Sequence, residues 1–179
     1  MCIRDSVFAA IPVQTYGEAP FTASASSASS GAITYSVISG PATIDSASGL
    51  VTLTGTGTVK LGASQAASGN YAAATASVSF TVDKGTPTLV FAAIPTQTYG
   101  EAPFTVSATS ASTGAVTYAV TSGPATVDGT TGLVTITGVG TVNLKATQAA
   151  TTDYIAATAT ASFTVNQETP CLLYTSRCV

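Results

Sequence analysis

One long segment of this chain occurs twice. The stretch VFAAIPVQTYGEAPFT begins at Val7 and returns as VFAAIPTQTYGEAPFT from Val90. A constant offset of 83 residues relates residues 7–83 to residues 90–166 without insertion or deletion, and 54 of the 77 aligned pairs are identical. A fixed period of this length identifies a tandem array of structural units. Both copies are therefore expected to adopt the same fold.

Each copy has the pattern of a small all-β unit. In the second copy, Val116–Val120 and Val142–Ala146 alternate apolar with mostly polar residues at period two, which is typical of a strand with one buried face. Between such runs lie turn formers such as Gly123-Pro124 and Asp128-Gly129. No segment sustains the 3.6-residue period of a helix, so we expect no substantial helix.

About seven short strands with frequent turns in each copy favour an immunoglobulin-like arrangement, since two facing sheets are needed to bury the apolar side chains. The predicted fold class is all-β, with two tandem immunoglobulin-like β-sandwiches of about seven strands each. The strands expected in the second copy are 88–92, 103–109, 115–121, 125–128, 132–137, 140–148 and 157–166. Its expected core is Phe91, Phe104, Val106, Val116, Tyr118, Val120, Val127, Leu133, Ile136, Val142, Leu144 and Phe163. The first copy has its own counterparts of these residues, Leu50 among them.

The repeat boundaries divide the chain into two domains and a connector. Residues 7–83 form repeat 1, whose first strand we expect to be truncated, and residues 88–167 form repeat 2. The linker between them is residues 84–87, a short stretch that contains a proline and so limits bending. Residues 168–170 begin the same junction again, which predicts that a further repeat follows.

Several spaced motifs carry a family resemblance. They are the run Tyr99-Gly100-Glu101-Ala102-Pro103-Phe104, the segment TSGPATVDGTTGLVTITGVGTVNLKATQA, and Tyr154 followed by the final ASFTV strand. Together they resemble the bacterial immunoglobulin-like repeats called MBG domains of the YGX type, over both copies. The resemblance implies a sandwich fold and membership in long secreted or cell-surface bacterial proteins, where such repeats are similar to adhesin stalks. It transfers no catalytic or ligand residue.

The two ends of the chain differ in character from the repeats. Residues 1–6 and 171–179 can be encoded by inverted copies of one DNA element, which resembles the transposon end used in sequencing libraries. We interpret both ends as translated adapter, to be excluded from fold reasoning. All three cysteines, Cys2, Cys171 and Cys178, lie there. The repeats then offer no disulfide, zinc site or thiol nucleophile, and any signal peptide or anchor lies outside this segment.

Composition argues against catalysis and against nucleic acid. The chain has no histidine, which removes Ser-His and Cys-His nucleophile pairs, and only 7% of its residues are charged. A net charge of −3 supplies no basic stripe for phosphates. The acidic residues occur singly rather than as a facing pair. We therefore predict no enzyme activity, no cofactor, no nucleic-acid partner and no membrane span within this segment.

Three acidic residues are candidate calcium ligands. Glu18 and Glu101 follow Tyr-Gly in the first turn of each repeat, and Asp83 lies between the repeats, where it could join Glu18 or Asp45. The alternative, which we favour, makes the two glutamates solvated turn residues. Asp45, like its counterpart in the second copy, is expected to hydrogen-bond its own turn.

Tyrosines are the only side chains that could stack on sugars, since tryptophan is absent. Tyr16 and Tyr99 are the candidate ligand contacts, although packing of the Tyr-Gly turn on the end of the sandwich is the favoured alternative. Of the others, Tyr35 and Tyr118 fall on inward positions, and we expect Tyr71 and Tyr154 to cap the core.

Two functions remain open. In the first, the segment is a non-catalytic spacer of a secreted or cell-surface protein and projects a terminal module, with neighbouring repeats as its partners. In the second, the repeats themselves bind polysaccharide or a cell-surface protein as an adhesion module. Adhesion assays on the isolated pair discriminate the two, because a spacer is inert.

Overall fold

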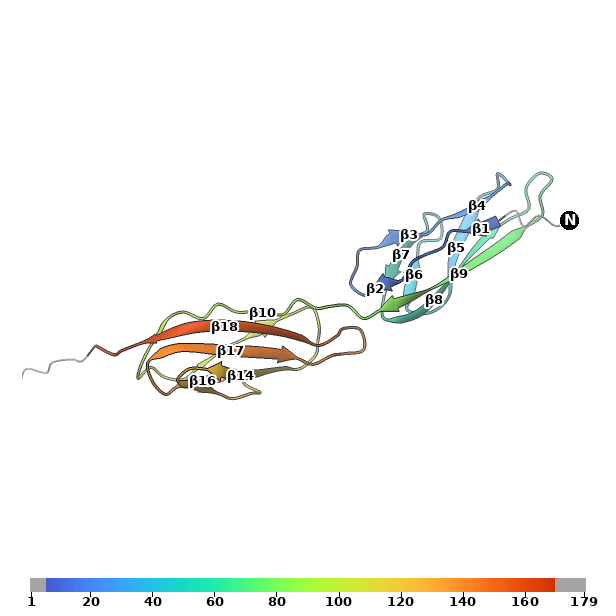
Figure 1. Ribbon diagram of the computed structural model, residues 1–179. Coiled ribbons are helices and arrows are strands. Elements are labelled where there is room, and N and C mark those ends of the chain that lie inside the picture. Colours follow the sequence, from blue (N-terminus) through green and yellow to red (C-terminus); the bar gives the residue numbers. More distant parts are fainter. Residues whose placement is uncertain (1–5, 170–179) are drawn as a thin grey trace, which may run out of the picture. The chain divides into compact units, whose positions relative to one another are not determined.

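The computed structural model describes residues 6–169 of the chain and divides them into two compact units. One unit comprises the residues up to Thr86 together with Thr151–Ile155, and the other comprises Pro87–Ala150 together with the residues from Ala156 onward. Each contains one sandwich (Figure 1). Of the two ends interpreted as adapter, residues 1–6 and 171–179, all but Ser6 lie outside the described residues, as do the three cysteines.

The repeat 1 sandwich has nine strand segments in three sheets. A four-stranded sheet runs in the order β2-β9-β8-β5, a three-stranded sheet in the order β3-β7-β6, and β1 pairs with β4. Figure 1 shows β8 and β9 as the longest pair. The strands are β1 (Ser6–Phe8), β2 (Gln14–Thr15), β3 (Phe21–Thr22), β4 (Ala25–Ser27), β5 (Ile33–Ser39), β6 (Ala42–Ile44), β7 (Leu50–Leu53), β8 (Gly57–Gln65) and β9 (Ala74–Asp83).

The repeat 2 sandwich has the same strands in the same order. Its sheets are β11-β18-β17-β14, β12-β16-β15 and β10-β13. The strands are β10 (Val90–Phe91), β11 (Gln97–Thr98), β12 (Phe104–Thr105), β13 (Ala108–Thr109), β14 (Val116–Ser122), β15 (Ala125–Val127), β16 (Leu133–Ile136), β17 (Gly140–Gln148) and β18 (Ala157–Asn166). The all-β, two-layer fold predicted from alternation is confirmed.

The prediction of about seven strands differs from the nine observed in two places. The expected strand 103–109 is interrupted at Val106-Ser107: β12 pairs with β16, whereas β13 pairs with β10. The chain thus changes sheets in the middle of the predicted strand. β11 was not predicted, and it pairs in parallel with β18 after an extended segment. Two residues of strand are too few to produce a visible alternation.

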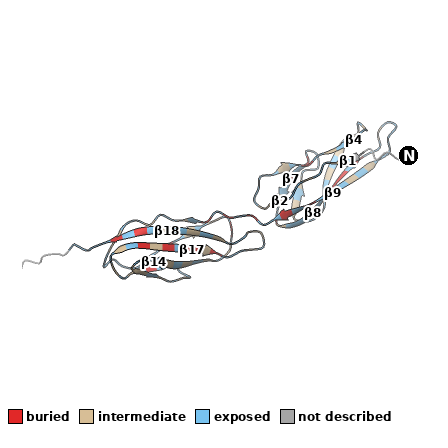
Figure 2. Cartoon of the chain, in the orientation of Figure 1, coloured by how far each residue is buried: buried red, intermediate tan, exposed pale blue. Residues whose placement is uncertain are grey.

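The core of repeat 2 is built from the inward positions of both layers. Its buried cluster is Val106, Val134, Val142, Leu144, Phe163 and Val165, and most other predicted core residues pack partly buried against it. Figure 2 shows this buried row along β17 and β18. The prediction for Leu133 is wrong: its side chain is 43% exposed, and so is Leu50 in repeat 1 at 44%. Val134 lies opposite Phe104 of β12 and Val127 of β15, and its side chain points into the core with theirs. Leu133, the next residue in the strand, must therefore point outward.

Two interactions join the layers within each sandwich. The hydroxyl of Tyr35 accepts a hydrogen bond from the backbone N–H of Ala25 (3.2 Å), and that of Tyr118 accepts one from Ala108 (3.1 Å). Each tyrosine ring also packs edge-on against a phenylalanine, Phe8 or Phe91. The inward placement predicted for Tyr35 and Tyr118 is confirmed.

A glycine turn between β14 and β15 permits a close backbone approach. Gly123 has φ 102°, in the region that favours glycine. A Cβ atom there would lie 2.3 Å from the carbonyl oxygen of Thr141. Gly40 repeats this geometry in the first sandwich, with φ 101° and the carbonyl of Thr58 as its neighbour. Glycine is therefore required where the chain leaves one sheet for the other.

Residues 6–169 contain no helix of the length and hydropathy needed to span a lipid bilayer.

Candidate functional site

The two turn glutamates each close their own turn. The Oε2 atom of Glu18 accepts a hydrogen bond from the backbone N–H of Thr15 (3.1 Å), and the N–H of Glu18 donates to the carbonyl of Thr15 (3.2 Å). Glu101 and Thr98 repeat both bonds at the same distances. One carboxylate oxygen is thus used locally in both copies. This geometry supports the structural alternative for Glu18 and Glu101.

Asp83 ends β9, next to the turn that contains Glu18. Its carbonyl accepts a hydrogen bond from the N–H of Tyr16 (2.9 Å). Calcium prefers six to eight oxygen ligands, and residues 6–169 contain no group of three or more acidic, histidine or cysteine side chains placed to hold a metal ion. The calcium site of Glu18, Asp83 and Glu101 remains a prediction without structural support among these residues.

The carboxylates of Asp45 and Asp128 organise the turns before β7 and β16, as the sequence predicts. In the first, Oδ1 accepts hydrogen bonds from Ser48 N (2.7 Å), Ser48 Oγ (2.7 Å) and Ala47 N (3.1 Å). The backbone bond from Ser48, then its hydroxyl and then the Ala47 amide lower the pKa of Asp45 below its ordinary value. In the second, the Thr131 amide, the Thr131 hydroxyl and then the Thr130 amide lower the pKa of Asp128. Both side chains are exposed, and each turn bonds to one carboxylate oxygen, Oδ1.

The two candidate tyrosines differ in environment. Tyr16 is half-buried and packs against the core of repeat 1. Tyr99 is 45% exposed. Tyr16 therefore fits the alternative in which the turn packs on the sandwich, whereas the ring of Tyr99 is accessible to solvent. Of the two tyrosines expected to cap the core, Tyr154 is half-buried, but the prediction for Tyr71 is wrong because its side chain is 43% exposed.

A buried glutamine in each repeat was missed at the sequence level. Gln148 is 2% exposed; its Nε2 donates to the carbonyls of Ser112 (2.9 Å) and Gly114 (3.1 Å), and its Oε1 accepts from the Ser110 hydroxyl (2.7 Å). Gln65 likewise donates to the carbonyls of Ser29 and Gly31. The sequence did contain a signal for this burial. Gln148 lies an even number of residues from Val142, Leu144 and Ala146, so its side chain points to the same buried face of β17. Each side-chain amide hydrogen-bonds the loop before β5 or β14, so its polar atoms are used in holding the structure together.

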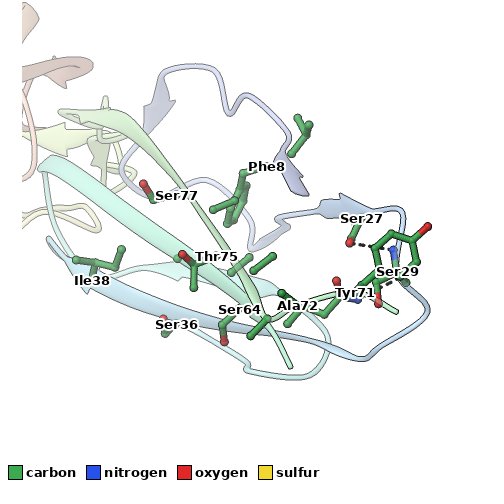
Figure 3. A pocket seen from close by; sticks show the side chains of 17 residues that line it. Phe8, Ser27, Ser29, Ser36, Ile38, Ser64, Tyr71, Ala72, Thr75 and Ser77 are labelled. Atoms are coloured by element: carbon green, nitrogen blue, oxygen red, sulfur yellow. Dashed lines mark hydrogen bonds between the residues drawn. The ribbon is translucent and has the colours of Figure 1, made fainter. Parts of the chain in front are cut away.

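Repeat 1 contains a hollow of about 1060 Å³ along β5, β8 and β9, with the end of β1 and the loop after β4 (Figure 3). We call it the repeat 1 hollow. None of its described lining residues carries a charged side chain. The lining is Val7, Phe8, Ser27, Ser29, Ser36, Ile38, Gly62, Ala63, Ser64, Gln65, Tyr71, Ala72, Ala73, Ala74, Thr75, Ala76 and Ser77.

Hydroxyl groups dominate the polar lining of the repeat 1 hollow. They belong to Ser27, Ser29, Ser36, Ser64, Thr75 and Ser77. A surface of uncharged hydroxyls can donate and accept hydrogen bonds. The arrangement can bind a polar, uncharged molecule.

Neither the family models nor the curated proteins include a match to this chain. Among solved structures, the chain is similar to Drosophila N-cadherin EC1-4 at 14% identity, with a TM-score of 0.36. That match covers 90% of this chain and 50% of the cadherin chain. Chicken VE-cadherin EC1-2 is similar at 13% identity with a TM-score of 0.37, covering 89% of this chain and 96% of that chain.

A third similar structure is a SusE-like, surface-located polysaccharide-binding protein from the Bacteroides thetaiotaomicron heparin utilisation locus. It is 15% identical with a TM-score of 0.32, and the match covers 90% of this chain and 34% of that protein. Similarity at these identities and scores concerns strand architecture only. It carries no argument about ligands, and the resemblance to MBG domains of the YGX type remains a prediction.

Proposed function

We propose that the two repeats are non-catalytic structural spacers of a larger secreted or cell-surface bacterial protein, and that they project a terminal module in the manner of an adhesin stalk. Each repeat encloses its own core from equivalent residues, so each is a complete structural unit. Arrays of such units derive their stability from within repeats and from neighbouring repeats. The partners under this proposal are neighbouring immunoglobulin-like repeats of the same chain.

The distribution of differences between the copies is the observation that carries this proposal. Most core substitutions are conservative, such as Ile44 to Val127 and Leu53 to Ile136, and cores tolerate such small changes in volume. Outward positions change chemistry, as from Gly62 to Lys145 and from Ile38 to Thr121. What the copies share is therefore the fold, whereas a common ligand would require a common surface.

The resemblance to MBG repeats of the YGX type agrees with this function. It would place the protein outside the cell, where stalk repeats separate a terminal module from the surface. Absence of histidine and engagement of the turn carboxylates support a non-catalytic role. The linker of residues 84–87 is short, which is expected of a spacer.

Arrays of two, four and six copies of residues 7–166 test the proposal by small-angle scattering. A spacer predicts that the maximum dimension grows by a constant increment with each added pair. The same arrays, immobilised on beads, should not adhere to cells above the level of bare beads. A maximum dimension that levels off with copy number would contradict the spacer, and adhesion that grows with copy number would favour the adhesion module.

A further inference from the structure

We propose that the repeat 1 hollow is a binding site for an uncharged glycan segment. This goes beyond the spacer function and does not depend on it, because a single binding repeat can sit within an otherwise inert array. The hollow's volume of about 1060 Å³ is of the order of known small-ligand pockets. Its chemistry selects the class of ligand.

The hydroxyls of the hollow are available to a ligand. Ser36, Ser64, Thr75 and Ser77 are exposed, and they come from three adjacent strands. Among described residues, no hydrogen bond engages the hydroxyls of Ser36, Thr75 and Ser77, whereas Ser64 shares one with Thr34 (2.8 Å). Each hydroxyl can donate one hydrogen bond and accept two. A ligand rich in hydroxyls can use both capacities, which a charged phosphate or carboxylate cannot.

The side chain of Tyr71 gives the hollow an apolar platform. It is 43% exposed, and Figure 3 shows it at one end of the hollow near Ser27 and Ser29. Two backbone hydrogen bonds with Ser68 (3.0 and 3.1 Å) hold the loop that carries it. A loop backbone held in this way loses little conformational entropy on binding. Sugar rings present an apolar face to such a platform while their hydroxyls point to the sides.

The floor of the hollow depends on a glycine. Gly62 lies in β8, where a Cβ atom would meet the Cδ1 atom of Ile38 at 3.1 Å and the hydroxyl of Ser36 at 3.2 Å. The absent side chain lets the side chains of Ile38 and Ser36 lie close over the sheet at this point. Ile38 is 55% exposed, which adds apolar surface at the opposite end from Tyr71.

Repeat 2 differs at these positions. Lys145 replaces Gly62, Thr121 replaces Ile38 and Ala119 replaces Ser36 at the same places in the repeat. A long cationic side chain therefore stands on this face of repeat 2, where repeat 1 has a glycine covered by Ile38 and Ser36. Ala119 pairs with Lys145 in repeat 2 as Ser36 pairs with Gly62 in repeat 1. The second repeat therefore shows how a lysine at this position would block the site.

The test compares the full chain with single variants in affinity electrophoresis through gels that contain dextran, mannan or arabinoxylan, with alginate as the anionic comparison. The expected result is retardation by at least one uncharged polysaccharide and not by alginate. Gly62→Lys should weaken that binding by about tenfold or more because the lysine would obstruct the hollow, and Tyr71→Ala should do so because it removes the aromatic platform. The matched control Tyr99→Ala should leave it unchanged.

Cooperative melting at the wild-type temperature, followed by circular dichroism, verifies that Gly62→Lys and Tyr71→Ala are folded. If Gly62→Lys fails to fold, Ser77→Val in the same hollow takes its place. Failure of all three uncharged polysaccharides to retard the wild-type chain overturns the proposal. Equal retardation of Gly62→Lys and wild type overturns it as well, and so does equal weakening by Tyr99→Ala. None of these outcomes bears on the dimensions of the arrays, so the spacer function is tested separately.

Discussion

Replacement of Gln148 by leucine should destabilise repeat 2 strongly. Leucine is close to glutamine in volume, so the substitution removes hydrogen bonds while filling the same space. Three bonds are lost: two to the carbonyls of Ser112 and Gly114, and one from the Ser110 hydroxyl. Ser112 is itself 7% exposed, so water cannot readily replace the lost partner.

The magnitude follows from the number of bonds. A buried hydrogen bond contributes about 1 kcal/mol net, and an orphaned buried carbonyl costs about 1–3 kcal/mol. Gln148→Leu should therefore lower the free energy of unfolding of repeat 2 by about 3 kcal/mol. Gln65→Leu in repeat 1 should cost about 1 kcal/mol less, because among the described residues only its two amide donor bonds are present.

Urea unfolding of the full chain, followed by circular dichroism, measures the effect. The variant should show one repeat that unfolds at markedly lower urea, with faster amide exchange over residues 110–115. The thermal midpoint of that repeat should fall by roughly 12–24 °C. Thr160→Val, on the exposed face of β18, is the matched control and should change stability by less than about 0.5 kcal/mol. A loss for Gln148→Leu as small as that of the control would refute the reasoning.

Three further predictions concern a turn, a hydroxyl and a carboxylate. Gly123→Ala should lower unfolding stability by about 2–4 kcal/mol because of its positive φ and the backbone clash; Gly69→Ala, with positive φ but open space, should cost only about 1 kcal/mol in the same urea assay. Tyr118→Phe should cost about 1 kcal/mol, since only the bond from the Ala108 amide is lost, and unchanged stability would contradict that role. The lowered pKa of Asp128 means that its stabilisation is complete above the ordinary aspartate pKa, about 4, and is lost as the pH falls through the lower folded-state pKa. Melting between pH 7 and pH 2 should thus fall less for Asp128→Asn than for the wild type, and parallel curves would count against this linkage.

The fold class was predictable because its signals are local. Alternation along segments such as Val142–Ala146 fixes which side chains share a face, and turn residues mark where strands end. The 83-residue period required both copies to fold alike. The turn role of Asp128 also followed, since its hydrogen-bond partners lie two and three residues away.

The candidate site was much less predictable. The repeat 1 hollow combines segments around residues 7–8, 27–29, 36–38 and 62–77, which only strand pairing brings together. Sequence patterns singled out Tyr16 and Tyr99, whereas the aromatic side chains that line the hollow are Phe8, which packs against the core, and the exposed Tyr71. Its exposure depends on a loop held by Ser68, which strand alternation does not describe.

The sequence by itself thus determined a duplicated, all-β unit with glycines at its sharp turns, because period-two patterning and turn chemistry act over a few residues. Only the tertiary structure decided that Val134 rather than Leu133 enters the core, that the chain changes sheets at Val106-Ser107, and that Gln148 is buried. Two adjacent apolar residues point to opposite faces of a strand, and which of them is buried depends on pairing with strands distant in the sequence.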